Sequence, residues 1–131
     1  MPEADAGLLE RVRPHLEGAR FAFVFGSFGT PAFGDESDLD LAVDFGRRLE
    51  SRERFELGGQ LDEAAGRRVD LVDLRSADAI ISMQVLRTGR AFLVADPHAL
   101  ALFQMTAPSR YFDWKISRRP VEEAMWVGAR P

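Results

Sequence analysis

The pattern over residues 38–45 constrains the fold more than any other stretch of the chain. Apolar side chains occupy positions 39, 41, 43 and 45, whereas Asp38, Asp40 and Asp44 occupy the alternate positions together with Ala42. A period of two is typical of a β-strand, in which successive side chains point to opposite faces. The apolar face must pack against helices, so we expect a layered sheet whose acidic face is left to water or a metal ion.

The rest of the chain alternates between helical and strand patterns. We expect helices at 6–19 with Asp5 as the N-cap, 50–65, 77–88 and 97–107, a further helical stretch beyond Pro108, and strands at 20–25, 38–45, 67–74 and 90–95. Residues 27–37 are expected to form a short helical turn followed by a loop. This order predicts an α/β (α+β) fold with a mixed, four-stranded sheet and helices mainly on one face. Pro108 is expected to break or kink the helix that contains it.

Composition limits the class of protein. The chain has 131 residues, which is enough for one domain, so we expect residues 1–131 to form a single domain. Cysteine is absent, which excludes disulfides and thiolate metal sites. The net charge of −4 argues against broad nucleic-acid binding. The acidic N-terminus is unlike a signal peptide and no long apolar run occurs, so we expect a cytoplasmic protein with no membrane segment.

The strongest chemical signal combines Gly26 and Ser27 with Asp38 and Asp40, ten residues further on. Two carboxylates at i and i+2 on a strand share a face and repel each other unless a cation lies between them. Mg²⁺ is commonly bound through one or two carboxylates together with phosphate oxygens. A Gly-Ser pair at the end of an apolar strand offers backbone N–H groups and a hydroxyl to phosphates. The segment therefore predicts a metal–nucleotide site.

The strand-like run 68–74 offers two candidates for a third carboxylate. Asp70 and Asp73 have opposite parity, so only one of them can face the acidic pair. An unpaired carboxylate in mid-strand is costly, which favours a functional role for Asp70, whereas Asp73 lies near the strand end, where we expect it to be solvated. We therefore favour Asp70 and keep Asp73 as the alternative. Asp44 is expected to be a surface residue rather than a ligand.

These residues resemble the signature of the nucleotidyltransferase superfamily that includes DNA polymerase beta. That signature is Gly-Ser, a ten-residue spacer, Asp-x-Asp and a third Asp on a later strand, which Gly26-Ser27, Asp38-Leu39-Asp40 and Asp70 match here. Within the superfamily, the chain most resembles the small MNT proteins (minimal nucleotidyltransferases). The resemblance covers roughly residues 5–119, and its specific residues lie between 25 and 74.

The resemblance implies a polymerase-beta palm-like fold and a reaction. Asp38, Asp40 and Asp70 would be the catalytic and Mg²⁺-binding residues, and Gly26 and Ser27 would bind the nucleotide. AMP would be transferred from ATP to an acceptor hydroxyl. MNT proteins often pair with a HEPN-domain partner, so the implied acceptor is a tyrosine of a HEPN ribonuclease toxin, which this antitoxin would silence. Two alternatives stay open: a non-catalytic antitoxin that neutralises its partner by contact, and a free-standing nucleotidyltransferase acting on a small molecule or an RNA end.

One position departs from the MNT pattern. Thr30 and Pro31 stand where MNT-type proteins often have Arg and Gly. A missing guanidinium removes one possible phosphate contact but leaves the carboxylates in place. This departure keeps the contact-only alternative open.

The C-terminal stretch mixes aromatic and basic residues. We expect a helix that packs Tyr111, Phe112 and Trp114 on the sheet and keeps a solvated basic face. The alternative is a surface at residues 118–119 that docks a partner or contacts RNA. Trp126 could anchor another chain.

Overall fold

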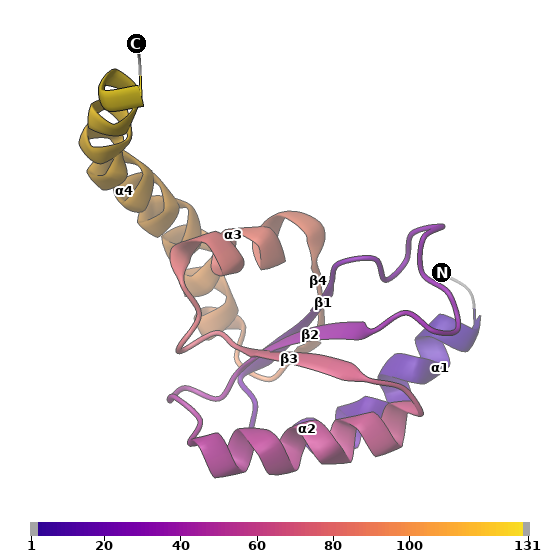
Figure 1. Cartoon of the computed structure of the whole chain (residues 1–131). Helices are drawn as coiled ribbons and strands as arrows, with labels where there is room; N and C mark the ends of the chain where they lie inside the picture. Colours follow the sequence, from indigo (N-terminus) through magenta and orange to yellow (C-terminus); the bar gives the residue numbers. More distant parts are fainter. Residues whose placement is uncertain (1–2, 130–131) are drawn as a thin grey trace.

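The computed structural model describes the backbone of residues 3–129 and the side chains of residues 5–117. Its strands are β1 (Phe21–Phe25), β2 (Leu39–Asp44), β3 (Val69–Asp73) and β4 (Arg90–Val94). They form one sheet in the order β3-β2-β1-β4, in which β1 is antiparallel to β2 and β4 while β2 and β3 are parallel (Figure 1). The α/β class and the mixed four-stranded sheet are confirmed.

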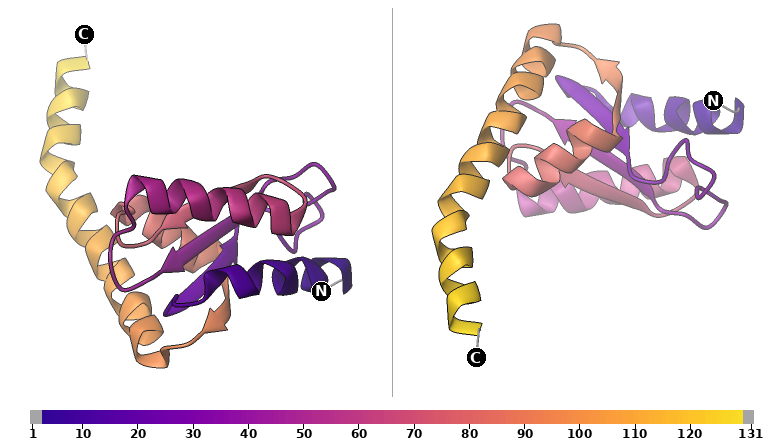
Figure 2. Two further views of the ribbon diagram at one scale, coloured as in Figure 1. Left: turned by 90° about the horizontal axis from the view of Figure 1, so that it is seen from below. Right: turned by 90° about the horizontal axis from the view of Figure 1, so that it is seen from above.

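One face of the sheet is covered by α1 (Glu3–Val12), the 3₁₀ turn η1 (Arg13–Leu16) and α2 (Ser51–Ala65) (Figure 2). The single helix expected at 6–19 is wrong in its bounds. The α-helix ends at Val12 because Pro14 lacks the N–H that a further α-turn would need. The N-cap expected at Asp5 is also wrong, since Asp5 lies inside α1.

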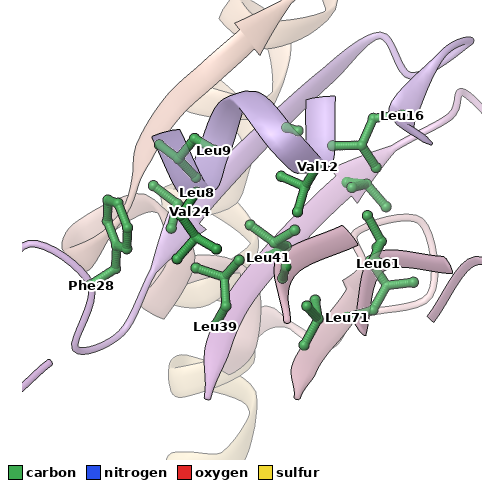
Figure 3. Packing of buried hydrophobic residues seen from close by; sticks show 14 of the residues in the cluster. Leu8, Leu9, Val12, Leu16, Val24, Phe28, Leu39, Leu41, Leu61 and Leu71 are labelled. Atoms are coloured by element: carbon green, nitrogen blue, oxygen red, sulfur yellow. The ribbon is translucent and has the colours of Figure 1, made fainter. Parts of the chain in front are cut away.

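The larger hydrophobic core lies between these helices and the sheet. The apolar residues of β2 at positions 39, 41 and 43 are fully buried here, as their alternation predicts. They pack against Leu8 and Val12 of α1 and Leu61 of α2 (Figure 3). Burial of this kind contributes about 25 cal/mol per Å² of apolar surface, which makes this contact the main anchor of β2.

The second face is covered in part by α3 (Ala79–Thr88) and by the beginning of α4 (Pro97–Ala129). A smaller core forms there around Phe21 and Phe23, which contact Phe103 of α4 at ring-centroid distances of 5.5 and 5.6 Å. The acidic face of β2 is therefore less open than expected. Ala42 and Asp44 are buried, and the half of this face near Asp40 remains accessible.

Helix α4 is one element of 33 residues, so Pro108 does not break it, and the helical stretch expected beyond Pro108 continues the same helix. The helix curves along its length and projects away from the sheet (Figure 2). Tyr111 and Trp114 stack on each other, at 6.0 Å between ring centroids, and Tyr111 lies beside α3 rather than on the sheet as expected. The predictions for positions 118, 119 and 126 concern side chains outside the described residues. None of the described helices is long and apolar enough to cross a membrane.

Candidate active site

A tight turn leads from β1 into the loop before β2. Gly26 has φ +73°, a backbone conformation that residues with a side chain rarely adopt. A Cβ at this position would also collide with Oδ2 of Asp40. Ser27 is half-buried, and its carbonyl accepts hydrogen bonds from N and Oγ1 of Thr30, at 3.0 and 2.6 Å. The turn thus brings the backbone of the Gly-Ser pair directly against the Asp40 carboxylate.

Three carboxylates gather at the end of the sheet beside this turn. Asp40 and Asp70 are directly paired in the parallel ladder between β2 and β3, so both side chains emerge on the same face. Asp38 precedes Asp40 by two residues and therefore has the same parity. Asp38 and Asp70 are exposed and Asp40 is partly buried. The structure thus brings together carboxylates from two segments that lie about 30 residues apart in sequence.

The grouping is electrostatically unfavourable. The pKa of Asp40 is raised, first because burial disfavours its charged form and then because of the negative charges of Asp70 and Asp38. A divalent cation would relieve this repulsion, and carboxylate oxygens are the hard ligands that Mg²⁺ prefers. The donor set formed by these three residues therefore fits a magnesium ion.

Asp38 has a basic neighbour next to the adjoining strand. Nε of Arg68, the residue before β3, lies 4.0 Å from Oδ2 of Asp38. Within the described part of the chain, no three acidic or histidine side chains are already arranged around one metal position.

Asp73 lies on the opposite face of β3 and is not solvated, contrary to expectation. Its side chain is 2% exposed. Oδ2 accepts a hydrogen bond from the backbone N–H of Leu49 at 2.8 Å, and Oδ1 accepts one from that of Arg75 at 3.1 Å. These contacts give Asp73 a structural role in holding the segment before α2 and the turn after β3.

Asp44 is not a surface residue either, although the sequence suggested one. It is buried and forms a two-point ion pair with Arg20, at 3.1 Å to Nε and 3.4 Å to Nη2. The backbone N–H of Gly46 donates to it at 2.6 Å, and Nε of Arg75 lies 3.5 Å away. Asp44 therefore joins three segments at the far end of β2.

Arg67, which no sequence pattern indicated as a site residue, holds the loop between the Gly-Ser pair and Asp38. Nη1 of Arg67 donates to the carbonyls of Gly34 and Ser37 at 3.0 and 3.1 Å. Its guanidinium lies over the ring of Phe33, 4.7 Å from the centroid. The only feature of the sequence that could have indicated this role is the position of Arg67 just before the strand that contains Asp70. Arg67 thereby helps to position the backbone that leads into Asp38.

A cavity of about 290 Å³ lies beside the turn, on the side of β4. It is lined by Val24, Phe28, Gly29, Thr88 and Arg90. The guanidinium of Arg90 comes 3.9 Å from where a Cβ of Gly29 would lie. The pocket thus combines apolar walls with a hydroxyl and a cation next to the Gly-Ser turn.

Sheet order, the Gly-Ser turn and the carboxylates define a nucleotidyltransferase-type domain, and sequence comparison agrees. Residues 10–98 match the family described as polymerase beta, nucleotidyltransferase. The chain belongs to this family.

Two individual proteins resemble this chain over much of its length. The chain is 32% identical over 83 residues to the protein adenylyltransferase MntA of Shewanella oneidensis, an alignment that covers 63% of this chain and 60% of that protein. The chain thus spans less than two thirds of the length of this relative. It is also similar to a chain in the crystal structure of a toxin–antitoxin complex with AMP-PNP, with 26% identity, a TM-score of 0.78, and coverage of 93% of this chain and 98% of that one.

A third relative comes from a structure of a tri-AMPylated Shewanella oneidensis HEPN toxin in complex with an MNT antitoxin. The similarity has a TM-score of 0.74 at 26% identity and covers 94% of this chain and 96% of that one. The likeness to these structures therefore extends beyond residues 10–98, into α1 and α4.

Proposed function

We propose that this protein transfers AMP from ATP to a tyrosine hydroxyl of a HEPN-domain toxin and thereby acts as its antitoxin. The observation that carries the proposal is the set of three carboxylates on one sheet face, directly beside the Gly-Ser turn. Membership of the nucleotidyltransferase family and the similarity to MntA support the reaction type. The similarity to a structure of an AMPylated HEPN toxin with its antitoxin supports the acceptor.

In this proposal each site residue has a role. Asp38 and Asp40 hold Mg²⁺, with Asp70 as the third ligand, and the ion neutralises charge on the triphosphate when it is bound. Backbone N–H groups at Gly26 and Ser27, with the Ser27 hydroxyl, orient the phosphates. Burial, followed by the charges of Asp70 and Asp38, raises the pKa of Asp40, and a bound cation would offset this cost.

The reaction is a substitution at phosphorus. The acceptor hydroxyl oxygen forms a bond to the α-phosphorus of ATP, the bond from that phosphorus to the bridging oxygen breaks, and pyrophosphate leaves with the bonding pair. The hydroxyl proton passes to Asp70, which is exposed and therefore accessible to an acceptor. The contribution of the protein is mainly positioning and charge stabilisation.

The second candidate function is a contact-only antitoxin. It is favoured by Thr30, whose hydroxyl is used within the turn, where it donates to the carbonyl of Ser27 at 2.6 Å. The loop therefore offers no guanidinium to a phosphate at this position.

The experiment incubates the protein with Mg²⁺, ATP labelled on the α-phosphate and a HEPN-domain protein encoded beside it. We expect label on a HEPN tyrosine and loss of nuclease activity. The double variant Asp38→Asn, Asp40→Asn should lower labelling by about 1000-fold, because several kcal/mol of charge stabilisation are lost. Glu56→Gln, which alters an exposed carboxylate on α2, is the matched control and should label normally. Silencing of the nuclease without any label would favour the contact-only function instead.

A further inference from the structure

Helix α4 carries apolar side chains on two opposite sides. One side, formed by Phe103, Ala107, Tyr111 and Trp114, faces the domain and is buried or half-buried. The other side faces away from the domain and carries four large apolar residues that are all exposed. They are Leu102 (47% exposed), Met105 (70%), Phe112 (58%) and Ile116 (66%). At 3.6 residues per turn these four positions fall along one line, which we call the outer stripe.

An outer stripe of this kind is unusual for a helix that needs only one packed face. A surface helix normally has one apolar side and one polar side, and a helix that is apolar on both sides is normally covered on both. Exposed apolar residues in a contiguous row mark an interaction surface more often than isolated ones. Helix α4 projects away from the sheet (Figure 1), and all four side chains of the stripe are exposed.

The spacing of the outer stripe indicates what would cover it. The residues at 102, 105, 112 and 116, with Ser109 between them, follow the alternating three- and four-residue steps of a helix that packs lengthwise on another helix. A partner helix would insert its own apolar side chains between them. This geometry favours a helical partner over an extended peptide, which would need a free sheet edge.

Positive charge at the inner end of the stripe sets a second requirement for the partner. A cavity of about 280 Å³ lies there, and its lining includes Leu102 of the stripe together with Arg20, Arg75, Arg110 and Asp44. Three guanidinium groups and one carboxylate thus line this cavity, which leaves two positive charges in excess. In a chain whose net charge is −4, this is a local basic patch that complements an acidic side chain.

We infer that the outer stripe and the arginine cavity together form the docking surface for an amphipathic helix of the HEPN-domain partner, with an acidic side chain at the end that meets the cavity. This inference rests on the proposed function for the identity of the partner. The surface lies away from the carboxylates, so the partner is held by α4 while another part of it reaches the active site.

The test measures binding of the partner by calorimetry, using the full chain. The variant Met105→Glu, Phe112→Glu places charges in the middle of the stripe, and we expect it to weaken binding at least about 100-fold, as for two central contacts of an interface. Arg110→Glu should weaken binding about tenfold and reduce the salt dependence. Both variants alter exposed side chains, so they should melt at the temperature of the parent protein.

Two matched controls lie on α2, on the other side of the molecule. Phe55 is 83% exposed and Arg52 is exposed on the same helix, so Phe55→Glu and Arg52→Glu make the same chemical changes away from α4. Neither should change binding more than about twofold. If the stripe variants bind the partner as tightly as the controls do, the inference is wrong.

Two further measurements separate this inference from the proposed function. The stripe variant should bind MgATP like the parent protein, because it leaves the carboxylates intact. If the parent protein binds the partner through α4 but transfers no AMP, the proposed function fails and the docking surface stands. If light scattering shows that the isolated chain is a dimer that Met105→Glu, Phe112→Glu converts to a monomer, the stripe is a self-association surface and the inference is overturned.

Discussion

The two ends of β2 and β3 carry the same kind of residue under opposite conditions. At the end where these strands begin, Asp38, Asp40 and Asp70 lie together on one face, with the guanidinium of Arg68 4.0 Å from one of them. At the end where the strands finish, Asp44 and Asp73 are 6% and 2% exposed. Both of these accept hydrogen bonds from groups that the fold places around them.

The contrast separates carboxylates that the fold neutralises from carboxylates that it leaves to repel one another. Burial of a charge is tolerated where fixed donors replace water, which is the case at Asp44 and Asp73. At the open end, partial burial and then the like charges of Asp70 and Asp38 raise the pKa of Asp40. Unfavourable electrostatics of this kind is typical of a site whose ligand supplies the missing charge. The following predictions test this contrast.

The largest effect is expected when each of the two candidate carboxylates of β3 is replaced separately by an amide. Asp70→Asn should lower AMP transfer by about 1000-fold with little change in stability, because it removes a charge from the open end. Asp73→Asn should leave the transfer rate of the folded protein unchanged but lower the free energy of unfolding by about 2 kcal/mol, since an amide cannot accept both backbone hydrogen bonds. Transfer assays and urea unfolding measure the two effects. The opposite pairing of effects would reverse the assignment of these residues.

A moderate effect is expected at Asp44. Asp44→Asn leaves Arg20 and Arg75 without their shared negative charge, so the free energy of unfolding should fall by about 2 kcal/mol. Asp113→Asn, at an exposed carboxylate, should change it by less than about 0.5 kcal/mol. Urea unfolding of the parent protein and of these two variants measures the differences in the free energy of unfolding. A stable Asp44→Asn protein would show that the closed end does not depend on this ion pair.

The smallest effect concerns the dependence of stability on pH and metal. Because the pKa of Asp40 is raised in the folded protein, the folded state binds a proton more tightly than the unfolded state. The cost of the charged carboxylate is therefore present at neutral pH and is relieved as the pH falls through the raised pKa. Asp40→Asn should stabilise the metal-free protein at neutral pH by less than about 1 kcal/mol, since water screens partly exposed charges. This gain should disappear as the pH falls towards the ordinary range of an aspartate.

Thermal melts with Mg²⁺ complete this test. Mg²⁺ should raise the melting temperature of the parent protein at neutral pH, because an ion that binds the folded state stabilises that state. Asp40→Asn removes a ligand of the ion, so Mg²⁺ should have little effect on the melting temperature of this variant. Equal stabilisation of both proteins would place the metal elsewhere.

Much of the fold could be predicted because periodicity and turn residues act locally. The alternation in β2 identified its buried face. The opposite parity of Asp70 and Asp73 predicted that only one of them shares a face with Asp40, and in the structure this is Asp70. Strand β1 was recognised from its apolar run, and α2 formed despite Gly58 and Gly59 because its ends are capped, by Glu50 with Glu53 and by Gly66.

The errors occurred where distant segments meet. Asp44 and Asp73 could not be recognised as buried because their partners, such as Arg20 and the backbone of Leu49, are 24 residues away in sequence. Pro108 did not end α4, because the helix packs against α3 and the sheet on both sides of it and this packing compensates for one lost hydrogen bond. The outer stripe of α4 was not anticipated, since exposure depends on what the rest of the chain covers.

The amino-acid sequence by itself determined which residues have the right chemistry for a nucleotide site, because side-chain type and strand parity are local properties. The register of β2 against β3 sets Asp70 opposite Asp40, and only the tertiary structure decided that register. The tertiary structure also decided which carboxylates are neutralised and which are left to repel one another, because charge interactions depend on distance in space rather than along the chain.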